Sequence, residues 1–157
     1  PGLRPTPDRV RETLFNWLGQ DLAGRATLEP YAGSGVLSLE ALSRGASAAV
    51  AIDQSAAAIG RLRETADAMR IGALETHVGD AIAALTRETR RFDVIFLDPP
   101  FATDPWPRLL PLCVARLADG GFIYAESAGP LAVPAELALH RQGKAGRVHY
   151  HLLRSAT

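Results

Sequence analysis

The segment Asp98-Pro99-Pro100-Phe101 directly follows an apolar run at residues 92–97 and brings together groups that could hold an amine. An ionised carboxylate such as Asp98 only accepts hydrogen bonds. Each proline likewise offers a backbone carbonyl as an acceptor and has no backbone N–H to donate. The ring of Phe101 offers a face on which a planar base can stack. Acceptors beside a stacking platform suit a planar base that carries an NH2 group. Together with the glycine turn Ala32-Gly33-Ser34-Gly35 earlier in the chain, this segment suggests methyl transfer to a base amine, with Asp98, Pro99, Pro100 and Phe101 as the expected catalytic residues.

A glycine-containing turn, Ala32-Gly33-Ser34-Gly35, lies earlier in the chain between an expected strand and an expected helix. Glycines let a ligand approach backbone N–H groups, which is typical of nucleotide or nucleoside pockets. In a dinucleotide fingerprint the third glycine or alanine would fall at position 38, where this chain has Ser38. A pyrophosphate is therefore disfavoured, whereas S-adenosylmethionine carries no phosphate and needs only the tight turn.

Four acidic residues are expected at successive strand ends, where they would line one edge of a sheet. Glu29 could face the cationic amino-acid end or the sulfonium of the cofactor. Asp53 follows the glycines by about twenty residues, the spacing at which a carboxylate accepts hydrogen bonds from both ribose hydroxyls. Asp80 could meet the adenine amine, cap the helix that follows it, or do both. The expected cofactor-binding residues are Glu29, Tyr31, Ala32, Gly33, Ser34, Gly35, Asp53, Gly79, Asp80, Ala81 and Asp98.

Strands alternate with helices along the chain, which predicts an α/β fold with a doubly wound, mostly parallel seven-stranded sheet and an antiparallel C-terminal hairpin. The expected strands occupy residues 26–31, 48–53, 75–78, 92–97, 122–126, 137–141 and 147–153. The first helix is expected to follow Thr6 as its N-cap. The others are expected at residues 35–44 and 55–69, from Asp80 onward, and from Asp104-Pro105 through Leu117. The ligand crevice of such a sheet lies at the carboxyl ends of its strands.

Length and composition fit one globular domain over residues 1–157, with 47% hydrophobic and 22% charged residues. Seventeen basic and seventeen acidic residues give no net charge, although phosphate contacts normally leave a basic surplus. The chain opens on Pro1 without a methionine, so the natural start is expected to be missing. No apolar run reaches membrane-spanning length. The lone Cys113 excludes an internal disulfide and fits a reducing compartment.

Basic residues occur near both ends of the chain. Arg9 and Arg11 lie near the start of the first helix, where the helix dipole disfavours cations, so a phosphate partner is one interpretation and pairing with Asp8 and Glu12 is the other. Residues 140–157 contain basic but no acidic side chains, for which a solvated face is favoured. The two histidines at 149 and 151 have no Cys, Asp or Glu beside them, so no metal site is expected.

The chain resembles class I S-adenosylmethionine methyltransferases, and more closely the RsmD family of bacterial small-subunit rRNA guanine-N2 methyltransferases. The resemblance runs from Leu3 to about Tyr150 and is narrowest in the N-terminal pattern RPTxDRVRExLFNWL. Two departures are Glu29-Pro30-Tyr31, where the family usually has Asp-Leu-Phe, and the absence of the basic hairpin that precedes Leu3 in the family. The matching segments are residues 3–18, residues 32–35 with 39–45, and residues 92–101.

The resemblance implies transfer of a methyl group to N2 of the guanine numbered 966 in 16S rRNA, within an assembling 30S subunit. It also implies S-adenosyl-L-methionine as cofactor, a cytoplasmic location and a monomer. Asp98 and the Pro99 carbonyl would accept hydrogen bonds from the guanine amine, and Phe101 would stack on a base extruded from its helix. The residues expected to contact RNA are Arg4, Arg9 and Arg11.

Other functions remain open on the sequence alone. Related Asp/Asn-Pro-Pro-aromatic loops serve methyltransferases that act on DNA adenine N6, on another rRNA guanine N2 or on a protein glutamine amide. A binding module for RNA assembly without catalysis would tolerate the loss of Asp98. An NAD-dependent reductase is disfavoured by Ser38, and hydrolase chemistry is unsupported because Ser34 has no His and acid arrangement to activate it.

Overall fold

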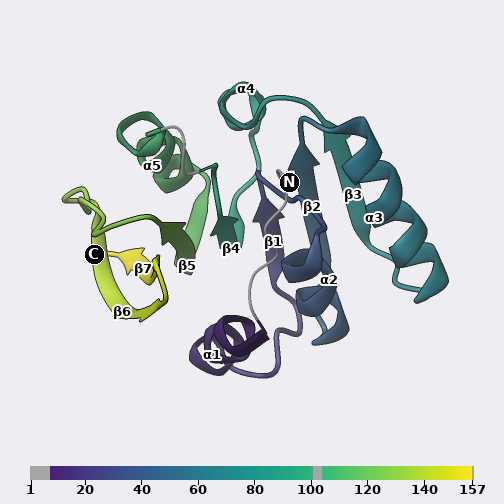
Figure 1. Cartoon of the computed structure of the whole chain (residues 1–157), viewed down its shortest axis with the longest axis horizontal. Coiled ribbons are helices and arrows are strands. Elements are labelled where there is room, and N and C mark those ends of the chain that lie inside the picture. The colour runs from purple at the N-terminus through teal and green to yellow at the C-terminus, as the bar shows by residue number, and fades with distance from the viewer. Residues whose placement is uncertain (1–7, 101–103, 157) are drawn as a thin grey trace.

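The computed structural model describes residues 8–100 and 104–156, which form a seven-stranded sheet with helices on both faces (Figure 1). The strand order is β3-β2-β1-β4-β5-β7-β6. The strands are β1 (Ala26–Glu29), β2 (Ala48–Asp53), β3 (Leu74–Val78), β4 (Phe92–Leu97), β5 (Leu117–Ser127), β6 (Leu137–Ala145) and β7 (Val148–Ser155). The helices are α1 (Asp8–Leu18), α2 (Val36–Ser43), α3 (Ala56–Ala68), α4 (Ala81–Arg87) and α5 (Trp106–Ala115).

The direction of winding reverses between β1 and β4. From β1 the chain proceeds to β2 and β3 on one side, and β4 and β5 then pair in parallel on the other side. Ligands of open α/β sheets bind at the carboxyl ends of the strands beside such a reversal. The last two strands are antiparallel, since β7 pairs with β5 and β6 pairs with β7. The predicted doubly wound sheet with an antiparallel C-terminal hairpin is therefore confirmed.

Alternate residues of the central strand β4 pack into two different cores. Val94 and Phe96 face α1 and α2, and the Phe15 ring of α1 lies 6.1 Å from that of Phe96. Ile95 and Leu97 face the opposite side, where they pack with buried residues of α4 and α5. This period of two explains why the strand reads as a continuous apolar run, because both of its faces are covered.

Helix α5 ends earlier than the sequence predicts, and the expected extension through Leu117 is wrong. Leu117 instead begins β5, where it pairs with Phe92, and the Phe92 N–H donates to the Arg116 carbonyl at 2.8 Å. The register shifts between Phe92 and Val94, and a Cβ at Gly121 would lie 2.9 Å from the Asp93 carbonyl oxygen. The glycine pair at 120–121 therefore lies inside an irregular strand. Thr6, the predicted N-cap of α1, lies outside the described residues.

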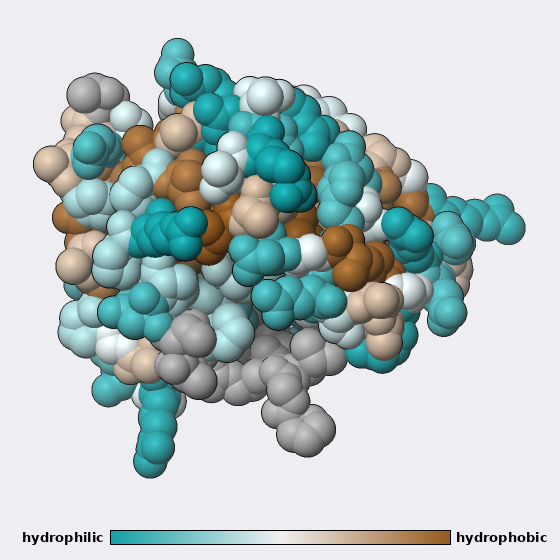
Figure 2. Space-filling view, turned by 90° about the horizontal axis from the view of Figure 1, so that it is seen from above, coloured by the Kyte–Doolittle hydropathy of each residue, from teal (hydrophilic) through white to brown (hydrophobic). Residues whose placement is uncertain are grey.

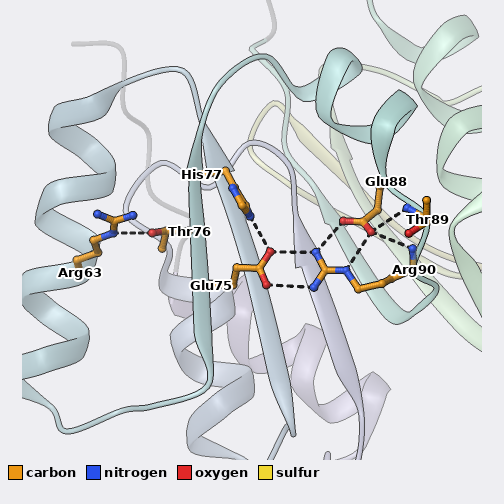
Figure 3. Close-up of polar contacts among 7 residues, drawn as sticks. All are labelled: Arg63, Glu75, Thr76, His77, Glu88, Thr89 and Arg90. Atoms are coloured by element: carbon orange, nitrogen blue, oxygen red, sulfur yellow. Dashed lines mark hydrogen bonds and ion pairs between the residues drawn. The ribbon is translucent and has the colours of Figure 1, made fainter.

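A cluster of charged side chains joins the edge strand β3 to the segment after α4 (Figure 3). The Arg90 guanidinium donates to both carboxylate oxygens of Glu75, at 3.1 and 2.9 Å, and to both oxygens of Glu88, at 2.8 and 3.0 Å. The His77 ring contacts Glu75 at 2.6 Å. Hydrogen bonds from Arg90 lower the pKa of both Glu75 and Glu88 to about 2.

Viewed from above Figure 1, the surface at the carboxyl ends of β1, β2 and β3 is largely hydrophilic with apolar residues exposed among the polar ones (Figure 2).

Among residues 8–100 and 104–156, no helix combines the length and apolarity needed to cross a membrane. Cys113 is a free, buried thiol.

Candidate active site at the carboxyl ends of the strands

Acidic residues stand at the carboxyl ends of five parallel strands that are neighbours in the sheet. In spatial order they are Asp80 after β3, Asp53 at the end of β2, Glu29 at the end of β1, Asp98 after β4, and Glu126 near the end of β5. The sequence predicts the first four. For Glu126 the sequence predicts only a place in a strand, because nothing local marks it as a site residue.

Asp53 holds the glycine turn through backbone hydrogen bonds. Its Oδ2 accepts from the Gly33 N–H at 2.8 Å, and its Oδ1 accepts from the Ser55 N–H at 2.9 Å. The turn itself closes with a bond from the Gly35 N–H to the Ala32 carbonyl at 2.8 Å. Gly35 has a φ of +74°, and a Cβ there would collide with the Leu62 side chain. Asp53 and the turn therefore form one unit, in which contact of Asp53 with a ribose remains a prediction.

Glu29 is buried and bonds to Ser38 of α2. Its Oε1 accepts from the Ser38 hydroxyl at 2.6 Å and from the Ser38 N–H at 3.1 Å. Burial raises the pKa of Glu29 to about 8, and the charges of Asp98 and Asp53 raise it further while the Ser38 bonds oppose the rise. A cation nearby would favour the ionised form. The sequence missed this role of Ser38, whose signal is a polar residue on the buried side of the helix.

Asp80 is the N-cap of α4, so the predicted capping role is confirmed. Its Oδ2 accepts from the Ala83 N–H at 2.8 Å, and Gln54 donates to its Oδ1 at 3.3 Å. The preceding Gly79 N–H donates to the Asp53 carbonyl at 2.9 Å, which joins the ends of β2 and β3. Contact of Asp80 and the adjoining Ala81 N–H with adenine remains a prediction.

Tyr31 and Ser34 lie on either side of the turn's first glycine and differ in exposure. Tyr31 is partly buried and packs against the core that contains Leu28. Burial raises the pKa of Tyr31 to about 12, and the charge of Asp80 contributes. Ser34 is exposed. The phenol of Tyr31 therefore stays protonated at neutral pH and can act as a hydrogen-bond donor beside the glycine turn.

Asp98 follows β4 and lies between the glycine-turn side and β5. Its charge raises the pKa of both Glu29 in β1 and Tyr124 in β5. Of the residues after it, Pro99 is buried and Pro100 is exposed. The fourth predicted catalytic residue, Phe101, lies outside the described residues.

A pocket of about 260 Å³ opens beside Asp98 on the side of β5. Since β4 separates β1 from β5, this pocket and the glycine turn lie on opposite sides of Asp98. Trp106 both lines the pocket and packs against the core beneath α5. The pocket is lined by Pro99, Pro100, Asp104, Trp106 and residues 126–131.

The arginines expected to contact RNA differ in their surroundings. Arg9 is exposed, whereas Arg11 pairs with Asp8 at 2.9 Å and with Glu40 of α2 at 3.6 Å. The structure thus gives Arg11 acidic partners, as the second interpretation of this segment expects, with Glu40 rather than Glu12 as the second one. Arg4 lies outside the described residues, and the RNA contacts of all three arginines remain predictions.

Comparison with known proteins gives a match over nearly the whole chain. A family model described as Conserved hypothetical protein 95 matches residues 1–154. The Escherichia coli (strain K12) protein named Ribosomal RNA small subunit methyltransferase D is 40% identical over 157 aligned residues, which span 97% of this chain and 79% of that protein. The chain belongs to the RsmD family. The resemblance seen in the sequence is confirmed.

Solved structures extend the RsmD family assignment to the fold. The yhhF protein of Escherichia coli, named as a candidate methyltransferase, superposes with a TM-score of 0.90 at 39% identity, covering 99% of this chain and 89% of that one. The HI0767 protein of Haemophilus influenzae, named as a candidate methylase, superposes with a TM-score of 0.84 at 31% identity, covering 96% and 99%. The RsmD match includes the glycine turn, Asp98 and β5, so the whole candidate site lies within the family's common fold.

Proposed function

We propose that this chain transfers a methyl group from S-adenosyl-L-methionine to the exocyclic N2 amine of a guanine in small-subunit rRNA. The observation that carries this proposal is the position of Asp98, between an acidic site built around a glycine turn and a pocket on the side of β5. The name of the Escherichia coli relative supports rRNA as the substrate.

The residues on the glycine-turn side fit a cationic nucleoside. Asp53 sits on the turn, where its carboxylate could accept hydrogen bonds from a ribose, and Asp80 stands at the next strand end. Glu29 is a buried acid whose pKa is raised to about 8, so an adjacent sulfonium or ammonium would hold it ionised. The Ser38 bonds would keep that carboxylate in place. We infer that these residues bind the cofactor through its positive charge and its ribose.

The cofactor supplies an electrophilic methyl group on a sulfonium. The guanine amine is a weak nucleophile, because its lone pair is delocalised into the ring. Hydrogen bonds from its N–H groups to Asp98 and to the Pro99 carbonyl would favour a pyramidal nitrogen. Holding that nitrogen in line with the methyl group supplies much of the acceleration through orientation. After transfer the nitrogen is acidic, and Asp98 or water can accept its proton.

The finer assignments follow from the family resemblance. They are the guanine numbered 966 as the target, an assembling 30S subunit as the form of the substrate and the cytoplasm as the location. Methylation of another rRNA guanine or of another amine is an outcome that the experiment below would detect.

The test is transfer of a tritiated methyl group to small subunits from a strain that lacks the endogenous enzyme, followed by mapping of the methylated nucleotide. We expect one guanine to acquire N2-methylation with the wild-type chain. The Asp98→Ala variant should keep much of its cofactor affinity by calorimetry but lose turnover. Equal turnover in the two proteins would remove Asp98 from the reaction, and absence of cofactor uptake would overturn the proposal as a whole.

A further inference from the structure

A row of three residues runs from the wall of the pocket across the C-terminal hairpin. Ser127 lines the pocket at the end of β5 and pairs with His149 of β7, which in turn pairs with Lys144 of β6. Residues that pair across a sheet lie on the same face of it. Two strand spacings separate Lys144 from Ser127, which is about 10 Å. We call Ser127, His149 and Lys144 the hairpin row.

The hairpin row lies on the same face of the sheet as the pocket. Ala125 of β5 and Leu153 of β7 pack in the core beneath α5, and Ser127 and His149 are an even number of residues away on the same strands. Trp106, which lines the pocket, packs against this core as well. A ligand in the pocket could therefore extend onto the hairpin row without crossing the sheet.

The opposite face of the hairpin carries two other exposed cations. Arg141 of β6 pairs with Leu152 of β7, and Arg154 of β7 pairs with Phe122 of β5. Leu152 and Phe122 pack in the core beneath α1 and α2. Arg141 and Arg154 thus lie on the face away from the pocket.

A tight turn holds Arg147 next to the end of the hairpin row. Ala145 pairs with Val148, so only Gly146 and Arg147 connect β6 to β7. Gly146 has a φ of +59°, which suits the first position of such a two-residue turn. Lys144 and Arg147 are both exposed, and within residues 8–100 and 104–156 neither forms an ion pair.

The charges around the pocket favour one orientation of a bound nucleotide. Asp104 lines the pocket and Asp98 lies beside it, and both carboxylates would repel a phosphate. From Leu137 to the end of the chain there is no Asp or Glu. Lysine and arginine contact the phosphates of nucleic acids, and an imidazole N–H can donate to one too. A nucleotide with its base in the pocket would therefore direct a phosphate toward His149 and Lys144.

We propose that Lys144, Arg147 and His149 bind a backbone phosphate of the rRNA strand beside the target guanine. The inference rests on the proposed function and adds to it a surface that holds the substrate strand. The Ser127 hydroxyl donates to the Gly129 carbonyl, so Ser127 serves as pocket wall. Phosphate contacts carry no sequence information, so these residues strengthen the binding of rRNA without selecting the base.

The test compares two double variants that remove the same charge from opposite faces of the hairpin. Lys144→Gln with Arg147→Gln removes two of the proposed phosphate contacts, and Arg141→Gln with Arg154→Gln is the matched control. All four side chains are exposed, so both variants should fold and melt at the wild-type temperature. If the first double variant melts earlier, the single variant Lys144→Gln takes its place.

Methylation of small subunits is measured at several salt concentrations, with subunits and S-adenosyl-L-methionine each varied in turn. In the first double variant, KM for the subunits should rise by about three- to tenfold, while kcat and KM for the cofactor stay at their wild-type values. The slope of log(kcat/KM) against log[salt] should become shallower by about 1, because fewer counterions are released. The control variant should keep the wild-type KM and slope.

Three outcomes would overturn the inference while guanine methylation persists. Equal changes in both double variants would show that net charge alone matters. Wild-type KM and slope in the first double variant would show that its cations contact no phosphate. A fall in kcat at unchanged KM would place these cations in the reaction step. If the wild-type chain methylates no guanine in the subunits, the proposed function itself fails and the inference fails with it.

Discussion

Ser38 gives both its hydroxyl and its backbone N–H to a single oxygen of Glu29, at 2.6 and 3.1 Å. The contact joins Glu29 at the end of β1 to the third residue of α2. Both side chains are buried. A small polar residue on the inner side of a helix thus fixes the orientation of the carboxylate that we assign to the cofactor.

Replacement of Ser38 by alanine should leave that carboxylate with fewer donors. We expect Ser38→Ala to destabilise the fold by about 1–3 kcal/mol, the usual cost when a buried polar group loses its partner. Cofactor affinity should also fall, because the pKa of Glu29 would rise further and the ionised form would become rarer. Urea unfolding and calorimetry measure the two effects. Ser43→Ala, at an exposed position of the same helix, is the matched control and should change neither quantity.

The raised pKa of Glu29 predicts that the free energy of unfolding of the cofactor-free protein decreases as the pH rises. The pKa rises from 4.5 in the unfolded chain to about 8 in the folded one, so the folded state binds the proton more tightly. The contribution of Glu29 to stability is therefore fully present below pH 4.5 and is lost as the pH rises toward 8. Relative to Glu29→Gln, the wild type should lose on the order of a few kcal/mol between pH 5 and pH 8.5.

Urea unfolding of both proteins across this pH range measures that difference. Addition of S-adenosyl-L-methionine should reduce it for the wild type, because the bound cation stabilises the carboxylate. Parallel stability curves for the two proteins would show that Glu29 titrates normally and would remove the electrostatic argument for its role.

The charged cluster at the β3 edge predicts a loss of stability in acid. The pKa of Glu75 and of Glu88 is lowered to about 2, so the stability that these residues contribute is present above pH 4.5 and is lost as the pH falls toward 2. Glu75 and Arg90 are about half exposed, which limits the effect to about 1 kcal/mol or less and makes it sensitive to salt. Arg90→Gln should lower stability at pH 7 but much less at pH 3, whereas Arg87→Gln, at an exposed position of α4, should have little effect at either pH. Urea unfolding at low and high salt tests this.

The glycine turn offers a substitution pair with opposite outcomes. Gly35→Ala would place a Cβ against Leu62 in a left-handed backbone conformation, and we expect a loss of about 1–3 kcal/mol together with weakened cofactor binding. Gly60→Ala, within α3, meets open space and should be neutral or stabilise by up to about 1 kcal/mol. Thermal unfolding compares the two, and equal behaviour would show that the turn does not constrain residue 35.

The sheet and most of its strands could be predicted, because apolar runs and alternating elements are local patterns. Leu117 could not, since its place in β5 depends on pairing with Phe92, which lies far away in the chain. Three of the four predicted acids, Glu29, Asp80 and Asp98, adjoin a glycine or a proline at a strand end, and Asp53 closes an apolar run. Ser38 gains its role from its tertiary contact with Glu29, and no spacing in the sequence encodes that contact.

The antiparallel direction of β7 determines where the basic residues of the C-terminal hairpin lie relative to the pocket. Because β7 begins where β5 finishes, with His149 opposite Ser127, the hairpin tip that carries Lys144 and Arg147 comes to the pocket's end of the molecule. Both of these cations are exposed. The rim of the sheet is thus acidic along β3, β2 and β1 and turns basic beyond β5. A protein whose charges sum to zero can in this way offer a negative field to a sulfonium donor and a positive one to a polyanion.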